Sequence, residues 1–536
     1  MNHPRLSKPL QAGTALAQAP EAPGVTHKKA RVPREVWWFV LVGASLRVVF
    51  FIFGQNNGGD AVARAELTAR WLQHPALRLN FEPWLPLHFW LMAGMSFLVR
   101  DTAVGTRLLS LVLGLSSLWV LWLLARRLYN DSTATFSLAI FALYSLHIAY
   151  STTSSSEVPY LFFVLLGLLA FFIHRETHSL PQLCLSAVAL GVAAGIRYEA
   201  WVCIFSLFLI LVFMPSGPPN IRRRIREVLL FGCLAGLWPV FWMLYQWKFF
   251  SKPLYGVTMN YAWVPQQLTG LSRSMLYRFA LPPGVLLITL TPVVLAAALY
   301  GMWLSLRQPR GREFCVVISL TAAAFVIQIA KGGLLPLARY TITLGTFAII
   351  VAGYGFDRWA LLLPRRRALQ FRVAVGVLLA CNLGGILVLS ESRAPVADKF
   401  ASISPLLRFP RHIEKVRQFL VPHLRAGDRV VVDDYNVESN IVAAAIGLPL
   451  LRGNRAFLAS EQPLSELFQY ISTEHPRYLI YSSQGTLRDE LRLPNVCSST
   501  PLVLRDGMGF SCVFSDDVYQ VYTIRYAPSG GMIAER

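Results

Sequence analysis

The chain has 536 residues, of which 54% are hydrophobic and only 15% are charged, and its mean hydropathy is +0.47. This composition excludes a single soluble globular domain and predicts a polytopic membrane protein. The formal net charge of +21 is typical of nucleic-acid binding or of membrane topology. Because the basic residues flank apolar runs, as the positive-inside rule expects, we predict no nucleic-acid partner.

The N-terminal region is predicted to be a tail followed by a membrane anchor. Residues 1–34 are rich in Ala, Pro and Gln and end in basic residues, which is typical of a disordered cytoplasmic tail. The apolar run from Val36 to Phe53 has no small-residue cleavage site, so we interpret it as a signal anchor that remains as the first span. The first loop, residues 54–104, is then predicted to be extracytoplasmic.

Two helices are predicted within this first loop. Val62, Ala65, Ala69 and Leu72 fall on one helical face, which is the pattern of a helix lying on the membrane surface. We interpret residues 83–99 as a second interfacial helix rather than a span. A span there would put the later arginine-rich loops outside, against the positive-inside rule.

Ten further apolar runs are predicted to cross the membrane, which gives about eleven transmembrane helices in a domain of residues 35–390. With this count the arginine-rich loops all fall on one side, which the positive-inside rule makes the cytoplasm. The runs lie at residues 105–124, 132–150, 157–174, 182–196, 198–214, 228–247, 283–305, 314–330, 337–355 and 370–390.

One long apolar stretch, residues 182–214, is divided between two of these runs. As a single helix its 33 residues would extend about 50 Å, well beyond a bilayer core of about 30 Å. A single helix would also bury Arg197 and Glu199 at mid-depth, where ionised groups are costly. We therefore predict two short spans with a turn at residues 195–199.

The C-terminal region, residues 391–536, changes character and is predicted to be a small extracytoplasmic α/β domain. Apolar strand patterns at 429–432, 478–481 and 518–524 alternate with helical patterns, which favours a mainly parallel sheet. The region has no glycine-rich dinucleotide fingerprint, so no nucleotide is predicted there. The helical patterns lie at residues 413–420, 438–446 and 464–472.

Of the seven cysteines, only two lie in polar sequence, Cys497 and Cys512. If this domain faces an oxidising compartment, these two are available to pair, a hypothesis that thiol labelling tests. The other five lie in apolar runs, where cysteine behaves as a small hydrophobe. No cysteine spacing typical of a metal site is present.

Ionisable residues next to apolar runs, away from the arginine-rich loops, gather on the predicted outer face. Because such groups are costly at membrane depth, their convergence indicates a polar site. They are Asp60, Glu66, Glu82, Glu157, Arg197, Glu199, Lys331 and Arg339.

Each of these residues also has a structural interpretation. Asp60 follows two glycines and begins a helical pattern, so it is suited to an N-cap, and Glu157 is suited to the first turn of a helix. Arg197 is close enough to Glu199 for a simple ion pair, yet its planar fork also suits phosphate. Lys331 is open to snorkelling or anion binding. Of these three cations, we expect Arg339 or Arg197, rather than Lys331, to be the one that binds an anion.

The order of features over residues 36–390 resembles the GT-C class of integral membrane glycosyltransferases. This class includes the protein O-mannosyltransferases, the lipid A aminoarabinose transferases and the galacturonosyltransferases acting on lipopolysaccharide. The likeness rests on Asp60 just after the first span and on the segments Pro83–Trp90, Thr106–Ser110, Arg126–Tyr129, Ile148–Ser151, Ser156–Pro159, Arg197–Glu199 and Ala338–Tyr340.

The resemblance implies transfer of a sugar from a polyprenyl-phosphate donor to an acceptor hydroxyl of a lipid, glycan or protein, on the outer side of a bacterial-type cytoplasmic membrane. Asp60 is then the general base, and Arg197, Arg339 and Lys331 hold the donor phosphate. The residues expected to contact substrate are Glu66, Glu82, His88, Glu157, Tyr198, Glu199 and Tyr340.

Two departures from the class pattern affect these expectations. Ala61 follows Asp60 where many relatives have a second acid, so we assign no residues to a metal site. Whether the reaction uses a divalent metal is left open. Glu82 precedes Pro83 where relatives often have a lysine, which indicates a different donor sugar. The alternative function is a transporter or flippase of a lipid-linked substrate, which would favour inverted repeats that the sequence does not show.

Overall fold

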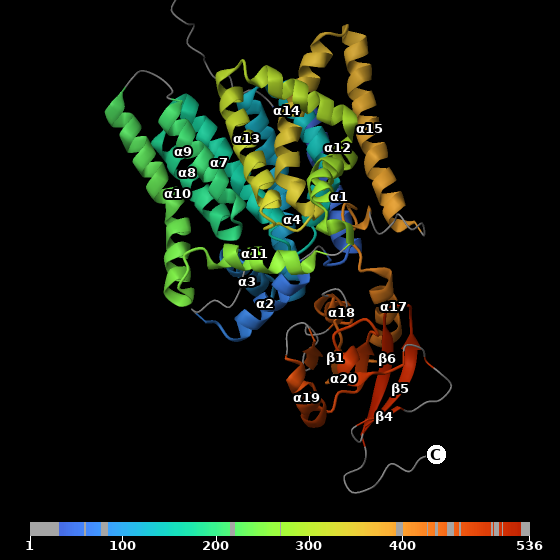
Figure 1. Ribbon diagram of the computed structural model, residues 1–536. Helices are drawn as coiled ribbons and strands as arrows, with labels where there is room; N and C mark the ends of the chain where they lie inside the picture. Colours follow the sequence, from blue (N-terminus) through green and yellow to red (C-terminus); the bar gives the residue numbers. More distant parts are fainter. Residues whose placement is uncertain are drawn as a thin grey trace, which may run out of the picture.

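The computed structural model consists of a bundle of long helices with a smaller α/β domain at one end (Figure 1). Three features of the sequence analysis lie outside the described residues: the tail up to residue 31, the glycines 58 and 59, and Glu82. The structure describes residues 32–57, 60–76, 84–214, 220–268, 270–392, 400–425, 427–434, 438–447, 455–459, 463–494, 497, 503–505 and 508–526.

The bundle contains the helices that the apolar runs predict. Among the described residues, seven helices are long and apolar enough to cross a membrane, namely α1, α4, α7, α10, α12, α13 and α15, and the protein is a multi-pass integral membrane protein. Its helices are α1 (Arg34–Phe53), α2 (Ala61–Gln73), α3 (Leu87–Val99), α4 (Thr102–Leu128), α5 (Asp131–Ala142), α6 (Ser145–Tyr150), α7 (Glu157–Thr177), α8 (Leu180–Ile196), α9 (Glu199–Phe213), α10 (Ile221–Phe250), α11 (Tyr255–Gln267), η1 (Gly270–Arg273), α12 (Met275–Ser305), α13 (Pro309–Ala330), η2 (Ala338–Thr341), α14 (Ile342–Leu361) and α15 (Arg365–Glu391).

Every predicted span overlaps at least one helix, although residues 337–355 include both η2 and the start of α14 and the count of eleven crossings remains a prediction. Residues 132–150 form two helices, α5 and α6, rather than one. The stretch 182–214 is broken where the sequence indicates, because α8 ends at Ile196 and α9 begins at Glu199. This break keeps Arg197 at a helix end, where its guanidinium reaches polar partners.

The two ends of the bundle differ in their charged residues. The arginine-rich loops meet at one end, where Arg127 and Arg310 both pair with Glu176, at 2.6 and 3.6 Å. We call this end the opposite face. The other end, which we call the domain face, carries residues 54–57, Asp60 and residues 151–157, 195–199 and 331–341, and it adjoins the α/β domain (Figure 1). The arginine-rich loops thus share one face, as predicted.

The first loop lies on the domain face. Helix α2 forms where the periodicity predicts it, and α3 follows. The start of α3 lies near the α8–α9 turn, since a side-chain carbon added at Gly195 would meet Leu87. Its end leads directly into α4, whose Thr106 accepts a hydrogen bond from Ser154 at 2.8 Å. Both ends of α3 therefore lie on the same face, as expected for a helix that does not cross the membrane.

The C-terminal domain has a mixed six-stranded sheet of order β2-β1-β3-β6-β5-β4. Only the pairs β1–β2 and β1–β3 are parallel, so the prediction of a mainly parallel sheet is wrong. Its elements are α17 (Arg411–Leu420), η3 (Val421–His423), β1 (Arg429–Val432), α18 (Ser439–Ala445), β2 (Arg455–Leu458), η4 (Leu464–Glu466), α19 (Leu467–Glu474), β3 (Tyr478–Tyr481), α20 (Arg488–Leu491), β4 (Val503–Arg505), β5 (Met508–Ser515) and β6 (Gln520–Tyr526).

The edge of the sheet at the end of β1 is built around one buried acid. The carboxylate of Asp433 accepts hydrogen bonds from the backbone N–H groups of Ser482 and Leu487, at 2.9 and 2.8 Å, and from the Thr486 hydroxyl at 3.2 Å. These bonds hold the loop that follows β3. Asp433 therefore supports the turn that ends β1.

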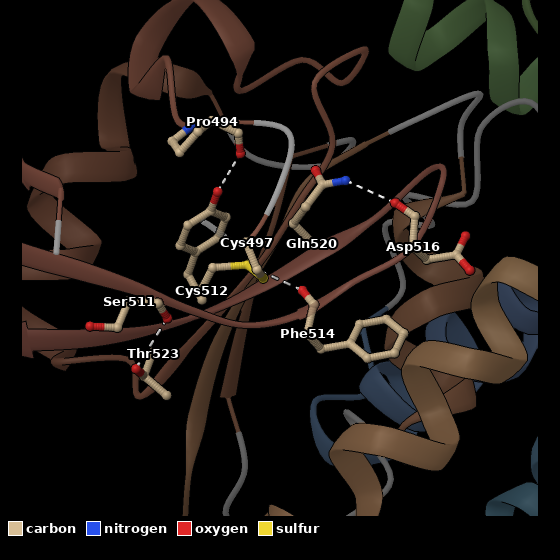
Figure 2. The surroundings of a disulfide bond; sticks show 9 residues. Pro494, Cys497, Ser511, Cys512, Phe514, Asp516, Gln520 and Thr523 are labelled. Carbon is tan, nitrogen blue, oxygen red and sulfur yellow. Dashed lines mark hydrogen bonds between the residues drawn. A yellow bond between two sulfur atoms is a disulfide. The ribbon is translucent and has the colours of Figure 1, made fainter. Parts of the chain in front are cut away.

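A disulfide joins Cys497 to Cys512 of β5, the pairing that the sequence analysis hypothesised (Figure 2). The same strand lies against β6, where the Thr523 hydroxyl donates to the Ser511 carbonyl at 3.3 Å. The disulfide therefore connects the segment before β4 to the antiparallel part of the sheet.

Candidate active site

Asp60 stands at the N-cap position of α2, but the described residues give its side chain no capping hydrogen bond. Instead its carboxylate lies between two arginines, Arg339 of η2 and Arg64 of its own helix. One oxygen accepts a hydrogen bond from Arg339 Nη2 at 2.9 Å, and the other lies 3.6 Å from Arg64 Nη2. The N-cap interpretation therefore describes the backbone position of Asp60 but not the interaction of its carboxylate.

Glu157 is the first residue of α7, and its side chain is only 2% exposed. Its Oε1 accepts a hydrogen bond from Arg197 Nη1 at 2.8 Å and lies 3.6 Å from Arg339 Nε. Arg339, from η2, consequently lies between two acids that begin two different helices, Asp60 before α2 and Glu157 in α7. The three residues come from positions up to 279 apart in the chain.

Arg197 continues this series of contacts in the turn between α8 and α9. Its guanidinium donates to Ser156 Oγ at 3.0 Å and to Glu199 Oε1, at 3.0 Å from Nε and 2.5 Å from Nη2. The local ion pair with Glu199 exists, but the same guanidinium also reaches Glu157. We call the connected residues the charged chain; in spatial order they are Arg64, Asp60, Arg339, Glu157, Arg197 and Glu199.

The charged chain alternates cations and acids. The side chains of Arg64, Arg339 and Glu157 are buried, whereas Asp60 is 26% and Glu199 41% exposed. Burial raises the pKa of the Asp60 carboxyl, but the positive charges of Arg339 and Arg64 lower it by more. The resulting pKa is about 2. Asp60 is therefore ionised at neutral pH and able to accept a proton. While it is paired with Arg339 it is a weak base.

Aromatic rings and the imidazole of His88 lie next to the charged chain. The Tyr340 ring lies under the guanidinium carbons of Arg339 and Arg197, at 5.2 and 5.5 Å from the ring centre. Arg64 donates toward His88 Nδ1 at 3.4 Å and lies over the Trp84 ring at 4.8 Å. Tyr340 and His88, both predicted to contact substrate, thus adjoin the charged chain.

Three other predicted residues lie apart from the charged chain. The Tyr198 hydroxyl accepts a hydrogen bond from Trp242 Nε1 at 3.0 Å, so it points toward α10. Glu66 forms an ion pair with Arg70 one turn along α2. Lys331 is exposed at the end of α13. The structure therefore brings Asp60, Glu157, Arg197, Arg339 and Glu199 into one connected set of contacts.

Sequence reasoning missed two members of the site, Arg64 and Ser156. The periodicity that predicts α2 does not single out Arg64, yet its position four residues after Asp60 is the spacing at which side chains on a helix meet. Ser156 begins one of the segments that carry the resemblance, but nothing in the sequence indicates its hydrogen bond to Arg197. Within the described part of the chain, no group of three or more His, Cys, Asp or Glu side chains is arranged to hold a metal ion.

Comparison with known proteins identifies relatives of part of the chain. Residues 74–243 match the family described as dolichyl-phosphate-mannose-protein mannosyltransferase. The undecaprenyl phosphate-alpha-4-amino-4-deoxy-L-arabinose arabinosyl transferases of Pseudomonas aeruginosa (strain UCBPP-PA14) and Pseudomonas paraeruginosa (strain DSM 24068 / PA7) are each 27% identical over 215 residues. That alignment covers 38% of this chain and 38% of each relative.

The fold is shared over nearly the whole chain with a solved structure. ArnT from Cupriavidus metallidurans bound to undecaprenyl phosphate superposes with a TM-score of 0.60 at 14% identity, covering 91% of this chain and 97% of that one. The same protein in its apo state gives a TM-score of 0.58, with 91% and 98% covered.

The helix bundle and the appended domain define a membrane protein whose fold resembles that of the GT-C class. Within this class the chain is ArnT-like in architecture, and its residues 74–243 carry the match to the protein mannosyltransferase family. The resemblance found in the sequence is thereby confirmed.

Proposed function

We propose that this protein transfers a sugar from a polyprenyl-phosphate-linked donor to an acceptor hydroxyl. The observation that carries the proposal is the position of Arg339, whose guanidinium lies between Asp60 and Glu157. A planar guanidinium suits phosphate oxygens, and Asp60 beside it suits a base. The relatives that match part of the chain are named for an undecaprenyl-phosphate-linked sugar, which supports this class of donor.

In the proposed reaction Asp60 removes the proton from the acceptor hydroxyl as its oxygen attacks the anomeric carbon. The bond from that carbon to the phosphate oxygen breaks, and the lipid phosphate leaves with the bonding electrons. Arg339 and Arg197 stabilise the charge that grows on the phosphate, so the leaving group needs no separate acid. As the phosphate draws Arg339 away from Asp60, the pKa of this carboxyl rises and Asp60 becomes a stronger base.

Unused hydrogen-bonding capacity at the centre of the site supports this role for Arg339. Among the described residues, neither Arg339 Nε nor Glu157 Oε2 has a hydrogen-bond partner, although both atoms are buried. Buried polar atoms usually have a partner in a folded protein. A bound phosphate oxygen would accept a hydrogen bond from Arg339 Nε, and a sugar hydroxyl would donate one to Glu157 Oε2.

The other predicted residues are assigned proposed roles around this centre. Glu199 and Tyr340 contact the sugar, and Lys331 is an outer contact for the phosphate. Glu66, Glu82, His88 and Tyr198 belong to the surrounding substrate-binding residues. The donor is proposed only as a polyprenyl-phosphate-linked sugar, and the acceptor only as a hydroxyl group.

The site and the C-terminal domain are proposed to face the extracytoplasmic side of a bacterial-type cytoplasmic membrane. Two observations support this orientation. The arginine-rich loops gather on the opposite face, which the positive-inside rule places in the cytoplasm. The C-terminal domain contains a disulfide, which forms and persists in an oxidising compartment.

The test is transfer of labelled sugar from polyprenyl-phosphate donors by membranes that contain the Asp60→Asn variant. Asparagine keeps the shape of the side chain but cannot accept the proton, so we expect the rate to fall by about 10²–10⁴-fold. Asp101→Asn is the matched control, because Asp101 caps α4 through Val104 N–H and asparagine caps a helix equally well. Unchanged transfer by Asp60→Asn would remove Asp60 as the base. Failure of the wild type to use any such donor would favour the transporter or flippase.

A further inference from the structure

Three consecutive amide side chains, those of Gln55, Asn56 and Asn57, follow the end of α1 and precede Asp60. All three are partly buried. Each makes a hydrogen bond to a segment that is distant in the sequence, and the partners belong to two different parts of the molecule. We call these residues the amide segment.

Asn56 connects the approaches to the two acids. Its Oδ1 accepts a hydrogen bond from the backbone N–H of Ser154 at 2.8 Å. Asn56 lies four residues before Asp60, and Ser154 lies three residues before Glu157. The bond therefore sets the distance between the two chain segments whose acids Arg339 bridges.

Arg107, from α4, supports the same arrangement from the side. Its guanidinium donates to the carbonyl oxygens of Phe51 and Gly54, at 2.6 and 3.1 Å, on the segment that leads to Asp60. It also donates to the Thr152 carbonyl at 2.8 Å, on the segment that leads to Glu157. Arg107 thus provides a second connection between the segment that leads to Asp60 and the segment that leads to Glu157.

Gln55 attaches the amide segment to the C-terminal domain. Its backbone N–H donates to Leu407 O at 2.8 Å, and its Oε1 accepts from the Phe409 N–H. Its Nε2 donates to Glu414 Oε2 at 3.3 Å. Glu414 belongs to α17, a helix that packs into the core of the C-terminal domain.

Asn57 makes a second attachment to that domain. Its Nδ2 donates to the Arg408 carbonyl at 2.6 Å. Helix α17, which follows directly, is itself held to the β5–β6 turn by the ion pair of Lys415 with Asp516. The sheet is therefore connected, through α17 and two neutral side chains, to a residue three positions before Asp60.

We propose that Gln55, Asn56 and Asn57 are positioning residues that set Asp60 against Arg339 and Glu157, and that the C-terminal domain acts on the site through them. The inference rests on the proposed function for Asp60. Amides suit this role because each donates and accepts without adding charge to the charged chain. Small displacements matter in such a site, since a misplacement of about 1 Å can cost about 10²-fold in rate.

The test compares two substitutions of Asn56 in the full-length protein. Asn56→Leu removes the acceptor for Ser154, and we expect kcat to fall about 10- to 100-fold while the KM for the polyprenyl-phosphate donor changes by less than about threefold. Asn56→Asp keeps an acceptor oxygen for the Ser154 N–H and should restore most of kcat. Gln55→Leu should lower kcat by about tenfold. Gln308→Leu on the opposite face removes an amide bonded to Tyr354 and should leave kcat unchanged.

Hydrogen exchange of the backbone gives a readout that is independent of activity. Faster exchange at residues 60–64 and 154–160 in Asn56→Leu, with the same melting temperature as wild type, would support the positioning role. Wild-type kcat or wild-type exchange in folded Asn56→Leu would overturn it. Failure of the wild type to transfer sugar would instead refute the proposed function, and the exchange comparison would then decide the positioning role by itself.

Discussion

Both ends of the helix bundle hold buried ion pairs, but the pairs are connected differently. On the opposite face, Arg175 of α7 binds Glu313 of α13 with two of its nitrogens, and both side chains are less than 10% exposed. The same guanidinium donates to the carbonyl of Met214 at the end of α9. On the domain face, by contrast, Arg339 is shared between two acids, and one of them, Asp60, is partly exposed.

The difference shows which pair is suited to structure and which to chemistry. Arg175 and Glu313 satisfy each other and join the ends of three helices, so an anion could bind there only by breaking the fold. In the proposed reaction Arg339 turns toward the phosphate, and Asp60, which is partly exposed, then still has Arg64 at 3.6 Å. An arginine shared between two acids can therefore exchange one of them for a phosphate, whereas Arg175, paired with Glu313, cannot.

The largest effect is expected from Arg339→Met. Loss of a cation aimed at the growing phosphate charge should lower kcat/KM for transfer by about 10³-fold. The pH profile should change as well. The base acts only when ionised, so the rate falls as pH falls through the pKa of Asp60. That pKa is about 2 in the wild type, and without Arg339 the effect of burial raises it. The acid limb of the profile should therefore move to higher pH.

Arg339→Lys separates charge from geometry in this experiment. Lysine keeps the positive charge but lacks the planar fork, so we expect part of the lost rate to return and the acid limb to stay low. If Arg339→Met left both kcat/KM and the pH profile as in the wild type, the charged chain would have no role in the reaction.

Breaking the closed pair should have the opposite character. Glu313→Gln leaves Arg175 buried without its counter-charge, and we expect the free energy of unfolding to fall by about 3 kcal/mol. Transfer per folded molecule should stay at the wild-type value, because the pair lies on the opposite face. The measurements are denaturation in detergent and transfer rate normalised to folded protein. A lowered rate with unchanged stability would show that the two faces do not divide structure from chemistry.

The sequence predicts the parts of the fold that depend on local pattern. The break between α8 and α9 follows from the cost of burying Arg197 and Glu199, and α2 follows from its periodicity. The sheet was predicted less well. Strands β2, β4 and β5 were not predicted, and in β5 an irregularity between Cys512 and Phe514 disturbs the alternation that marks a strand. Without β5, the antiparallel pairing of β5 with β6 cannot be predicted, and so the mixed character of the sheet is not predicted either.

For the site, the sequence indicates the members better than their contacts. The cost of ionised groups near a membrane singles out Asp60, Glu157 and Arg339, but their pairing depends on how η2 packs against α2 and α7. The direction of Tyr198 depends likewise on α10, which supplies Trp242 as a partner for its hydroxyl. Such contacts are tertiary, and no local pattern encodes them.

The smallest effect is expected from Lys331→Gln. Lys331 is an exposed cation that follows the end of α13, at the edge of the domain face, and the described residues give its ammonium no ion pair. A solvated charge interacts weakly with a phosphate and is screened by salt. We therefore expect the KM for the donor to rise about two- to fivefold at low ionic strength, with kcat unchanged. The difference from wild type should shrink as salt is added. A fall in kcat comparable to that of Arg339→Met would instead place Lys331 within the charged chain, and the distinction between shared buried cations and solvated ones would fail.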